Sequence, residues 1–345
     1  MTASDIRELA RQCGFELAGV ARAEPLDHRQ RFHEWVAAGF AGDMRYLTDH
    51  RAAIRDDPRN LLPSARSLIC VGKLYNTPWP YSTQFTGPER AWISRYAWGE
   101  DYHLVLRRSL ARLEALLRDR CGDSFEARIC VDTAPLLERS YARRAGLGWI
   151  GKNTCLISQP YGSWFFLGEL IVSFEIEADS PPPDRCGSCT RCIDACPTAA
   201  LIPTPDGCRL DSRLCISYLT IELRGSVPEE RRSTAGPHVF GCDICQDVCP
   251  WNRRAPMTTD PEFQPREFAP PLEQLAALGE DEFRALFRGT PVTRARYAGF
   301  LRNVAVAMGS RGLPQFRAPL ERLAASDDRT VAEHARWALQ QLGTS

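Results

Sequence analysis

The hydrophobic positions in the first half of the chain follow two different periods. Short apolar runs at residues 68–72, 127–131 and 167–174 are typical of buried strands. Over residues 102–117, between the first two runs, leucines recur at helical spacing with arginines on the opposite face, which predicts an amphipathic helix. The mixture of strands and helices predicts an α/β fold for residues 1–180.

Helical periodicity dominates the last third of the chain. Apolar residues repeat every three or four positions over residues 300–308, 316–323 and 331–342. Thr330 and Glu333 open the last of these stretches with the spacing of a capping box. Short helices in succession predict an all-α, HEAT-like domain over residues 256–345.

A stiff connector separates the first region from a cysteine-rich one. Residues 179–184 include three consecutive prolines, which disfavour helix and sheet hydrogen bonding and predict an extended segment. Nine of the fourteen cysteines then lie between Cys186 and Cys249. We therefore expect three domains, at residues 1–180, 181–255 and 256–345.

Composition and charge restrict the partners. The 345 residues are 44% hydrophobic and 25% charged, which is ordinary for a globular protein. Basic and acidic side chains both number 43, so there is no overall positive field for nucleic acid, and any RNA contact must come from a local patch. The sequence contains neither a recognisable export signal nor an apolar stretch long enough to span a bilayer, so we expect a cytoplasmic monomer without a membrane contact.

The cysteines have a spacing that is specific to iron–sulfur proteins. The run Cys186-x2-Cys189-x2-Cys192-x3-Cys196-Pro197 matches the bacterial two-cluster ferredoxin motif. Soft thiolates suit iron, and the two-residue gaps let one loop bind three corners of a 4Fe–4S cluster. Zinc ribbons are the alternative, but they keep well-separated C-x2-C pairs and need no trailing Cys-Pro. The run predicts a ferredoxin-like domain.

A second, incomplete set of cysteines follows, and it fits an exchange of ligands. In two-cluster ferredoxins the fourth cysteine of the run ligates the other cluster. Cys186, Cys189, Cys192 and Cys249 are therefore expected to hold the first cluster, and Cys196, Cys242 and Cys245 need a fourth partner. The candidates are Cys215 and Cys208, and we prefer Cys215 because it precedes an apolar helix-like run. We interpret Cys13, Cys70, Cys121, Cys130 and Cys155 as small buried hydrophobic residues.

An acid stands at the end of a predicted strand. Asp132 follows the apolar run 127–131, and α/β sheets usually place ligands at the carboxyl ends of their strands. Shielded by Trp149 and Tyr141, such an acid would have a raised pKa and donate a proton. As a cap for the next helix it would be structural, and the residues alone favour neither interpretation.

Several segments together resemble the epoxyqueuosine reductase family. They are residues 131–139 (VDTAPLLER), 146–154 (GLGWIGKNT), 161–169 and 218–225, together with the cysteine set, and the resemblance extends over residues 45–310. It implies two 4Fe–4S clusters, a cobalamin cofactor bound in the α/β domain and a low-potential electron donor. The implied reaction is reductive removal of the epoxide oxygen from epoxyqueuosine at the wobble position of a tRNA, which gives queuosine.

The resemblance also implies roles for individual residues. Asp132 is the proton donor, kept protonated in a pocket lined by Trp149, Trp164 and Tyr96, while cobalamin reduced through the clusters attacks the epoxide. The implied cobalamin contacts are Arg55, Tyr96, Asp132, Lys152, Asn153 and Thr220. The sequence lacks an Asp-x-His-x-x-Gly motif, so we expect no histidine below the cobalt.

Basic residues gather locally although the chain is neutral. We interpret the following arginines as a surface that tracks phosphates: Arg224, Arg231, Arg232, Arg253, Arg254, Arg294, Arg296, Arg302 and Arg311. Arg224 is our choice for a single tRNA contact. One alternative function is a cobalamin-dependent reductive dehalogenase, which needs no RNA surface. The other is an electron-carrier iron–sulfur subunit, which leaves residues 1–180 without a role.

Overall fold

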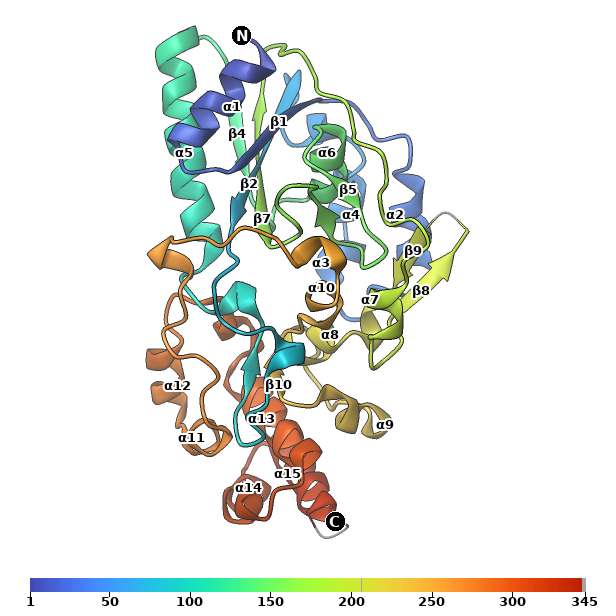
Figure 1. Cartoon of the computed structure of the whole chain (residues 1–345), viewed down its shortest axis with the longest axis vertical. Coiled ribbons are helices and arrows are strands. Elements are labelled where there is room, and N and C mark those ends of the chain that lie inside the picture. Colours follow the sequence, from blue (N-terminus) through green and yellow to red (C-terminus); the bar gives the residue numbers. More distant parts are fainter. Residues whose placement is uncertain (206, 343–345) are drawn as a thin grey trace.

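The structure, a computed structural model, describes residues 1–205 and 207–342. In Figure 1 the chain runs from the sheet and its helices at the top, through the cysteine-rich segment at the middle, to a group of helices at the bottom. Within the described residues, no helix combines the length and the apolar character needed to cross a membrane.

A four-stranded antiparallel sheet organises the N-terminal part. Its strands lie in the order β1 (Leu17–Arg22), β2 (Ser67–Leu74), β7 (Phe165–Val172) and β4 (Ala127–Cys130). Alternate residues of β2 face opposite sides: Ile69 and Val71 join the core under the helices α1 (Ala3–Gln12) and α5 (Tyr102–Cys121), whereas Leu68 and Cys70 face α6 (Glu138–Arg144). The three predicted strands and the predicted helix are confirmed, and β1 was not predicted.

Short elements connect the sheet strands. Helices α2 (Gln30–Ala37), α3 (Arg45–Thr48) and α4 (Arg51–Ile54) lie between β1 and β2 in the sequence, and β3 (Trp92–Ile93) precedes α5. The hairpin of β5 (Trp149–Ile150) and β6 (Leu156–Ile157) follows α6. These connections place the residues after β4 and those before α5 at the same end of the sheet.

The cysteine-rich segment has little regular structure. It contains α7 (Arg191–Asp194), the hairpin of β8 (Leu201–Thr204) and β9 (Gly207–Leu210), α8 (Ile216–Ile221), α9 (Glu229–Arg232), β10 (His238–Phe240) and α10 (Ile244–Asp247). Strand β10 pairs in parallel with β3, so the segment is joined to residues that lie far earlier in the chain.

The C-terminal part is helical, with α11 (Leu272–Ala277), α12 (Glu280–Leu286), α13 (Tyr297–Arg311), α14 (Arg317–Ala324) and α15 (Arg329–Gln341). The three predicted helical stretches are confirmed. Helices α13 and α15 meet closely at Gly309, where an added Cβ would lie 2.8 Å from the Cα of Ala338. The predicted capping box at Thr330 is wrong: Asp328 caps α15, because its carboxylate accepts the free N–H groups of Thr330 and Val331 at 2.9 and 3.0 Å.

Candidate active site and cluster-binding cysteines

Four of the predicted cluster ligands line one cavity. The cavity has a volume of about 240 Å³, and the cysteines in its wall are Cys186, Cys189, Cys192 and Cys249. Burial raises the pKa of Cys192 to about 12, and the nearby charges of Cys249 and Cys186 add to that rise. Four thiols in the wall of one cavity fit a 4Fe–4S cluster, which relieves their mutual repulsion by binding them as thiolates. Cys249, from the second motif, is therefore the fourth cysteine of this site, although Cys196 is the fourth cysteine of the first motif.

The other four predicted ligands lie near one another. Burial raises the pKa of Cys215, with a contribution from the charge of Cys196, and burial raises the pKa of Cys242, with a contribution from the charge of Cys215. Cys245 interacts with both Cys242 and Cys215. Cys208 instead lies on the β8–β9 hairpin, opposite Pro203. This group of thiols fits a second cluster, with Cys215 at the start of α8.

The remaining cysteines follow the prediction only in part. Cys13, Cys70 and Cys130 are buried, but Cys121, the last residue of α5, is exposed. The thiol of Cys155 forms a hydrogen bond with that of Cys245, so Cys155 lies beside a predicted cluster ligand. Sequence periodicity carries no signal for this contact, because it joins residues far apart in the chain.

Asp132 lies in the loop after β4, and a histidine that the sequence analysis missed is bound to it. Its Oδ2 accepts a hydrogen bond from Nε2 of His103 at 3.0 Å, and Nδ1 of His103 lies 2.7 Å from Oδ1 of Asp101. Asp101 is the N-cap of α5 and accepts the His103 N–H, so the helix start fixes the ring between two carboxylates. In the sequence, the Asp101-x-His103 spacing before the predicted helix was the one sign of this contact. The same spacing is also typical of a helix N-cap, so it does not by itself indicate a catalytic pair.

The charges at this site differ from those that were predicted. Burial lowers the pKa of His103, but its hydrogen bonds to Asp101 and Asp132 outweigh burial and raise it to about 9. Burial works to raise the pKa of Asp132, and the hydrogen bond and charge of His103 outweigh it, so that the pKa is lowered. The predicted rise for Asp132 is wrong, because the hydrogen bond and the charge of His103 favour the ionised carboxylate and lower its pKa.

The predicted shielding of Asp132 also needs correction. Trp149 packs against Trp251 with ring centroids 5.0 Å apart, beside Cys249, and Trp164 stacks on Tyr81 at 5.7 Å. The hydroxyl of Tyr141 donates to the carbonyl of Glu24 at 2.9 Å. Among the predicted aromatic residues, Tyr96 interacts with Asp132, whose charge contributes to the raised pKa of Tyr96 after the larger effect of burial. Asp132 itself has a side chain that is 43% exposed.

An arginine from the C-terminal part reaches the same site. Nη1 of Arg294 lies 4.0 Å from Oδ2 of Asp132, and its Nη2 lies 2.7 Å from Oε1 of Glu222. Arg224, which is exposed, donates to the carbonyl of Arg294 at 3.0 Å, and the charge of Arg296 acts on Arg224. Arg294 therefore lies beside Asp132, and Arg224 and Arg296 lie near Arg294; all three belong to the predicted basic surface.

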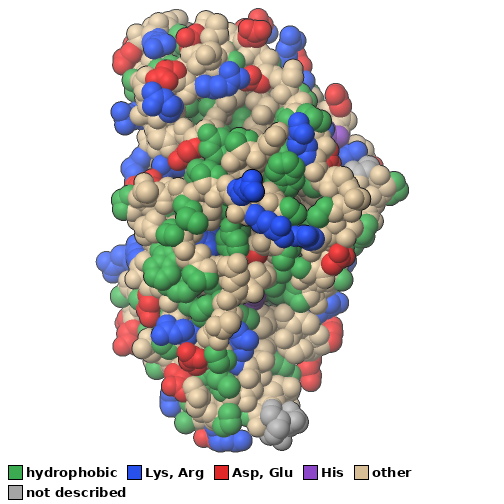
Figure 2. Space-filling view, viewed as in Figure 1, with side chains coloured by type: hydrophobic (Ala, Val, Ile, Leu, Met, Phe, Trp, Pro, Cys, Tyr) green, Lys and Arg blue, Asp and Glu red, His purple; other side chains and the backbone are tan. Residues whose placement is uncertain are grey.

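Two arginines of the predicted basic surface are buried and are removed from it. The guanidinium of Arg302 donates to the carbonyls of Leu219 and Leu223 at the end of α8, at 2.6 and 2.9 Å. Arg232 pairs with Glu333. On the face in Figure 2, basic and acidic side chains mix at both ends, whereas several basic ones lie near the middle among hydrophobic side chains.

The predicted cobalamin contacts fall into separate groups. Nζ of Lys152 donates to the carbonyls of Gly187 and Cys189 at 2.7 and 3.0 Å, and Nδ2 of Asn153 to that of Cys245 at 3.4 Å, so both hold cluster loops. Arg55 donates to the backbone of Tyr46 and Arg51, and Thr220 to that of Ile216. Tyr96 and Asp132 lie together. The half-exposed polar groups around Asp132 fit one side of a large polar cofactor.

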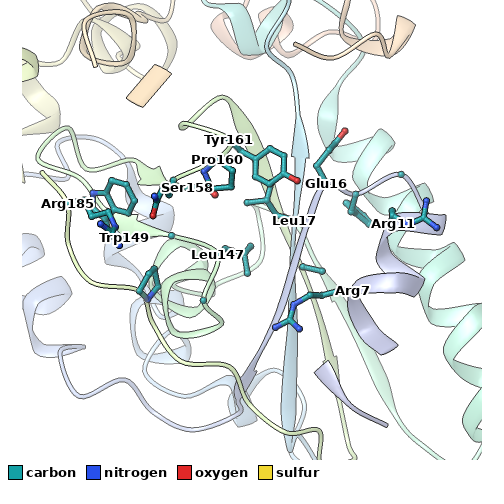
Figure 3. A pocket seen from close by; sticks show the side chains of 17 residues that line it. Arg7, Arg11, Glu16, Leu17, Leu147, Trp149, Ser158, Pro160, Tyr161 and Arg185 are labelled. Atoms are coloured by element: carbon teal, nitrogen blue, oxygen red, sulfur yellow. The ribbon is translucent and has the colours of Figure 1, made fainter. Parts of the chain in front are cut away.

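A larger cavity lies next to the first cluster site. It has a volume of about 650 Å³ and lies between β1 and the loop around β5 (Figure 3). Figure 3 shows Trp149 and Arg185 at one end, Arg7 and Arg11 at the other, and Leu17 and Leu147 between them. Arg185 also lines the cavity of the first cluster. This cavity contains neither Asp132 nor a predicted cluster ligand, so we do not place the reaction there.

The cysteine segment defines the class of the protein. Residues 185–252 match the family described as "4Fe-4S double cluster binding domain", so the chain is an iron–sulfur protein with two clusters. Residues 55–133 match the family "Epoxyqueuosine reductase QueG, DUF1730". An epoxyqueuosine reductase of Xanthomonas campestris pv. campestris is 42% identical over 347 residues, covering 99% of this chain and 96% of the relative. The chain therefore belongs to the epoxyqueuosine reductase family.

Solved structures agree with this assignment. An epoxyqueuosine reductase crystallised with an epoxyqueuosine-modified tRNA-Tyr stem loop has a TM-score of 0.90 and 31% identity, covering 99% of this chain and 90% of that one. The Bacillus subtilis enzyme, with its catalytic aspartate loop swung out of the active site, has a TM-score of 0.76 and 28% identity, with 98% of both chains covered.

Proposed function

We propose that this chain reduces epoxyqueuosine in tRNA to queuosine, using two 4Fe–4S clusters and cobalamin. The observation that carries the proposal is the 42% identity, over nearly the whole of both chains, with an epoxyqueuosine reductase. Removal of the epoxide oxygen as water consumes two electrons and two protons. A dehalogenase or a plain electron carrier would not account for this family membership.

We assign the organisation and setting of the enzyme in the same proposal. The α/β part, residues 1–180, binds cofactor and substrate, residues 181–255 carry the clusters, and residues 256–345 form the HEAT-like part. The chain acts as a monomer in the cytoplasm, where its tRNA substrate is found. Arg55, Tyr96, Asp132, Lys152, Asn153 and Thr220 remain the proposed cobalamin contacts, with Tyr96 and Asp132 closest to the reacting atoms.

The residues around Asp132 supply the protons. When bound, the clusters supply electrons singly and cobalamin supplies the nucleophile for the epoxide carbon. Asp132 gives a proton to the departing oxygen. Nε2 of His103, 3.0 Å from Oδ2 of Asp132, then gives its proton to Asp132 for the second transfer. Asp101 orients the ring from its other side. Arg294 stabilises negative charge next to Asp132.

The whole proposal is tested with anaerobically reconstituted protein. The protein is supplied with cobalamin, a strong reductant and tRNA that carries epoxyqueuosine, and the digested nucleosides are then separated by mass spectrometry. We expect queuosine to accumulate at the expense of epoxyqueuosine. If no queuosine forms in protein that holds both clusters, the proposed function is wrong.

The pH dependence of turnover follows from His103. Its pKa is raised to about 9, and the proton that it holds is the one required, so kcat/KM should fall as the pH rises through about 9. Asp101→Asn removes a carboxylate that stabilises the imidazolium, and it should move this fall to lower pH. Iron content measured at each pH separates this effect from cluster loss. An unchanged profile in the variant would contradict the role of the pair.

Binding of the tRNA is expected to depend on Arg224. Because this exposed arginine contacts Arg294, which itself lies beside Asp132, we propose that it contacts a phosphate. Arg224→Ala should raise KM for tRNA with little change in kcat, and it should reduce the slope of log affinity against log salt by about one. Arg322→Ala on α14 removes the same charge from an exposed site elsewhere and should change neither. Equal effects of both variants would refute a specific contact.

We place the entry of electrons at the first cluster. Three cations, Lys152, Arg185 and Arg191, line its cavity, and no acidic side chain of the described residues does. A low-potential electron carrier with an acidic surface is complementary to this charge. Arg185→Glu with Arg191→Glu should slow reduction of the clusters by such a carrier at least tenfold, and more at low salt. Reduction by dithionite at saturation serves as the control; an unchanged carrier rate would exclude this docking surface.

A further inference from the structure

A glutamate is buried in the middle of the sheet, behind the Asp132 loop. Glu169 on β7 is 0% exposed, and it lies beside Cys70 of β2 and Cys130 of β4 in the strand register. Neither of its carboxylate oxygens has a hydrogen-bond donor in the part of the chain that the structure describes. An isolated ionised carboxylate in such surroundings is very unfavourable, so Glu169 keeps a proton.

A second carboxyl group faces Glu169 from α6. Glu138, in the first turn of this helix, interacts with Glu169, and burial raises the pKa of both groups. The charge of Asp132 adds to the rise at Glu138, and the charge of Glu138 adds to the rise at Glu169. Two carboxylates cannot hydrogen bond to each other, whereas an acid and a carboxylate can. When the two groups hold one proton between them, the carboxylic acid of Glu169 donates a hydrogen bond to the carboxylate of Glu138. The negative charge then lies on Glu138.

Glu138 also holds the loop that carries the proposed acid. Its Oε1 accepts the backbone N–H of Asp132 at 2.6 Å. Asp132 has φ of 46°, a left-handed conformation that an aspartate keeps only where its surroundings hold it. We propose that Glu138 and Glu169 share one proton and form a latch, which holds the Asp132 loop from behind with its carboxylate toward His103.

The strength of the latch depends on the charge of Asp132. Because Asp132 and Glu138 repel each other when both are ionised, a protonated Asp132 leaves Glu138 charged, and a charged acceptor holds the N–H more strongly. After Asp132 has given up its proton, the pair binds its own proton more tightly and the latch weakens. The loop is thus held most strongly when Asp132 carries the proton that it donates. The other titratable groups that act on the pair are Arg55, Tyr102, Arg139, Cys70 and Cys130.

Proton sharing is tested on cluster-loaded protein without tRNA. A buried acid with a raised pKa contributes stability that is fully present below the ordinary glutamate pKa and is lost as the pH rises through the folded value. The melting temperature of the parent should therefore fall as the pH rises above about 5, because the pKa of both glutamates is raised in the folded protein. Glu169→Gln should show a smaller fall, because the amide still donates to Glu138 but does not titrate. The control is Glu175→Gln, an exposed site just beyond β7, which should behave as the parent does.

The latch itself is tested by turnover, and this part rests on the proposed function. Glu138→Ala should lower kcat at least tenfold with KM for tRNA and iron content unchanged, because the loop loses its support. Glu138→Gln keeps a carbonyl acceptor and should lose less. Parental kcat in Glu138→Ala, or parental pH dependence of melting in Glu169→Gln, overturns the inference. If Glu138→Ala fails to bind iron, the pH dependence of melting in Glu138→Gln tests the inference instead. Equal melting curves for Glu138→Gln and the parent would then overturn the inference. A parent without activity would refute only the proposed function, because the melting comparison needs no substrate.

Discussion

Asp132→Asn is expected to lower queuosine formation by about 100- to 10,000-fold, the usual contribution of a general acid. The amide keeps the size of the side chain and can still accept a hydrogen bond from His103, but it has no proton to give to the departing oxygen. Single-turnover assays with pre-reduced protein, followed by nucleoside mass spectrometry, measure this loss at the chemical step.

The controls for Asp132→Asn separate chemistry from structure. Iron content and the cob(II)alamin spectrum should remain those of the parent, and Asp123→Asn, at an exposed acid after α5, should leave turnover unchanged. Loss of cofactor in Asp132→Asn would support a structural role. Turnover within a factor of two of the parent would remove Asp132 from the proposed chemistry and leave His103 as the candidate donor.

His103 changes the chemical meaning of Asp132. An aspartate with a lowered pKa is a poor acid on its own, whereas an aspartate in hydrogen-bond contact with an imidazolium can be protonated when a bound substrate disfavours the ion pair. The same contact can supply the second of the two protons that the reaction needs. Catalysis is therefore better assigned to the Asp101–His103–Asp132 chain than to one carboxyl group.

Local patterns predicted those parts of the site that depend on local geometry. Cys186, Cys189 and Cys192 share one loop, so their spacing alone describes how they meet a cluster. The strand before Asp132 was predicted for the same reason, because a buried strand leaves an apolar run. The position of Cys249 followed from a general rule about paired ferredoxin motifs, and it agrees with the cavity that this residue shares with the first three.

Contacts between distant segments could not be predicted in this way. His103 and Asp132 are separated by 29 residues, and the charge of each depends on that contact. Arg302 was taken for a surface residue because it belongs to a group of arginines, but its guanidinium satisfies carbonyls at the end of α8 and is buried. Glu169 lies in a strand that reads as apolar, so its partner on α6 appears only once the sheet and helix are packed together.

Cys215→Ala is expected to remove the second cluster. Iron should fall from about eight to about four atoms per chain, because a 4Fe–4S cluster needs four ligands and Cys196, Cys242 and Cys245 supply only three. Queuosine formation should stop with it, because electrons that enter at the first cluster then lack the next carrier. Iron analysis and electron paramagnetic resonance of the dithionite-reduced protein measure the two effects separately.

The matched control for Cys215→Ala is Cys208→Ala. Both cysteines lie between the two motifs in the sequence, but Cys208 is on the β8–β9 hairpin, whereas Cys215 interacts with Cys196 and Cys242. Cys208→Ala should therefore keep both clusters and full turnover. If it loses a cluster while Cys215→Ala keeps both, the fourth ligand has been assigned wrongly. If both variants keep two clusters, Cys155 becomes the candidate, because its thiol already contacts Cys245.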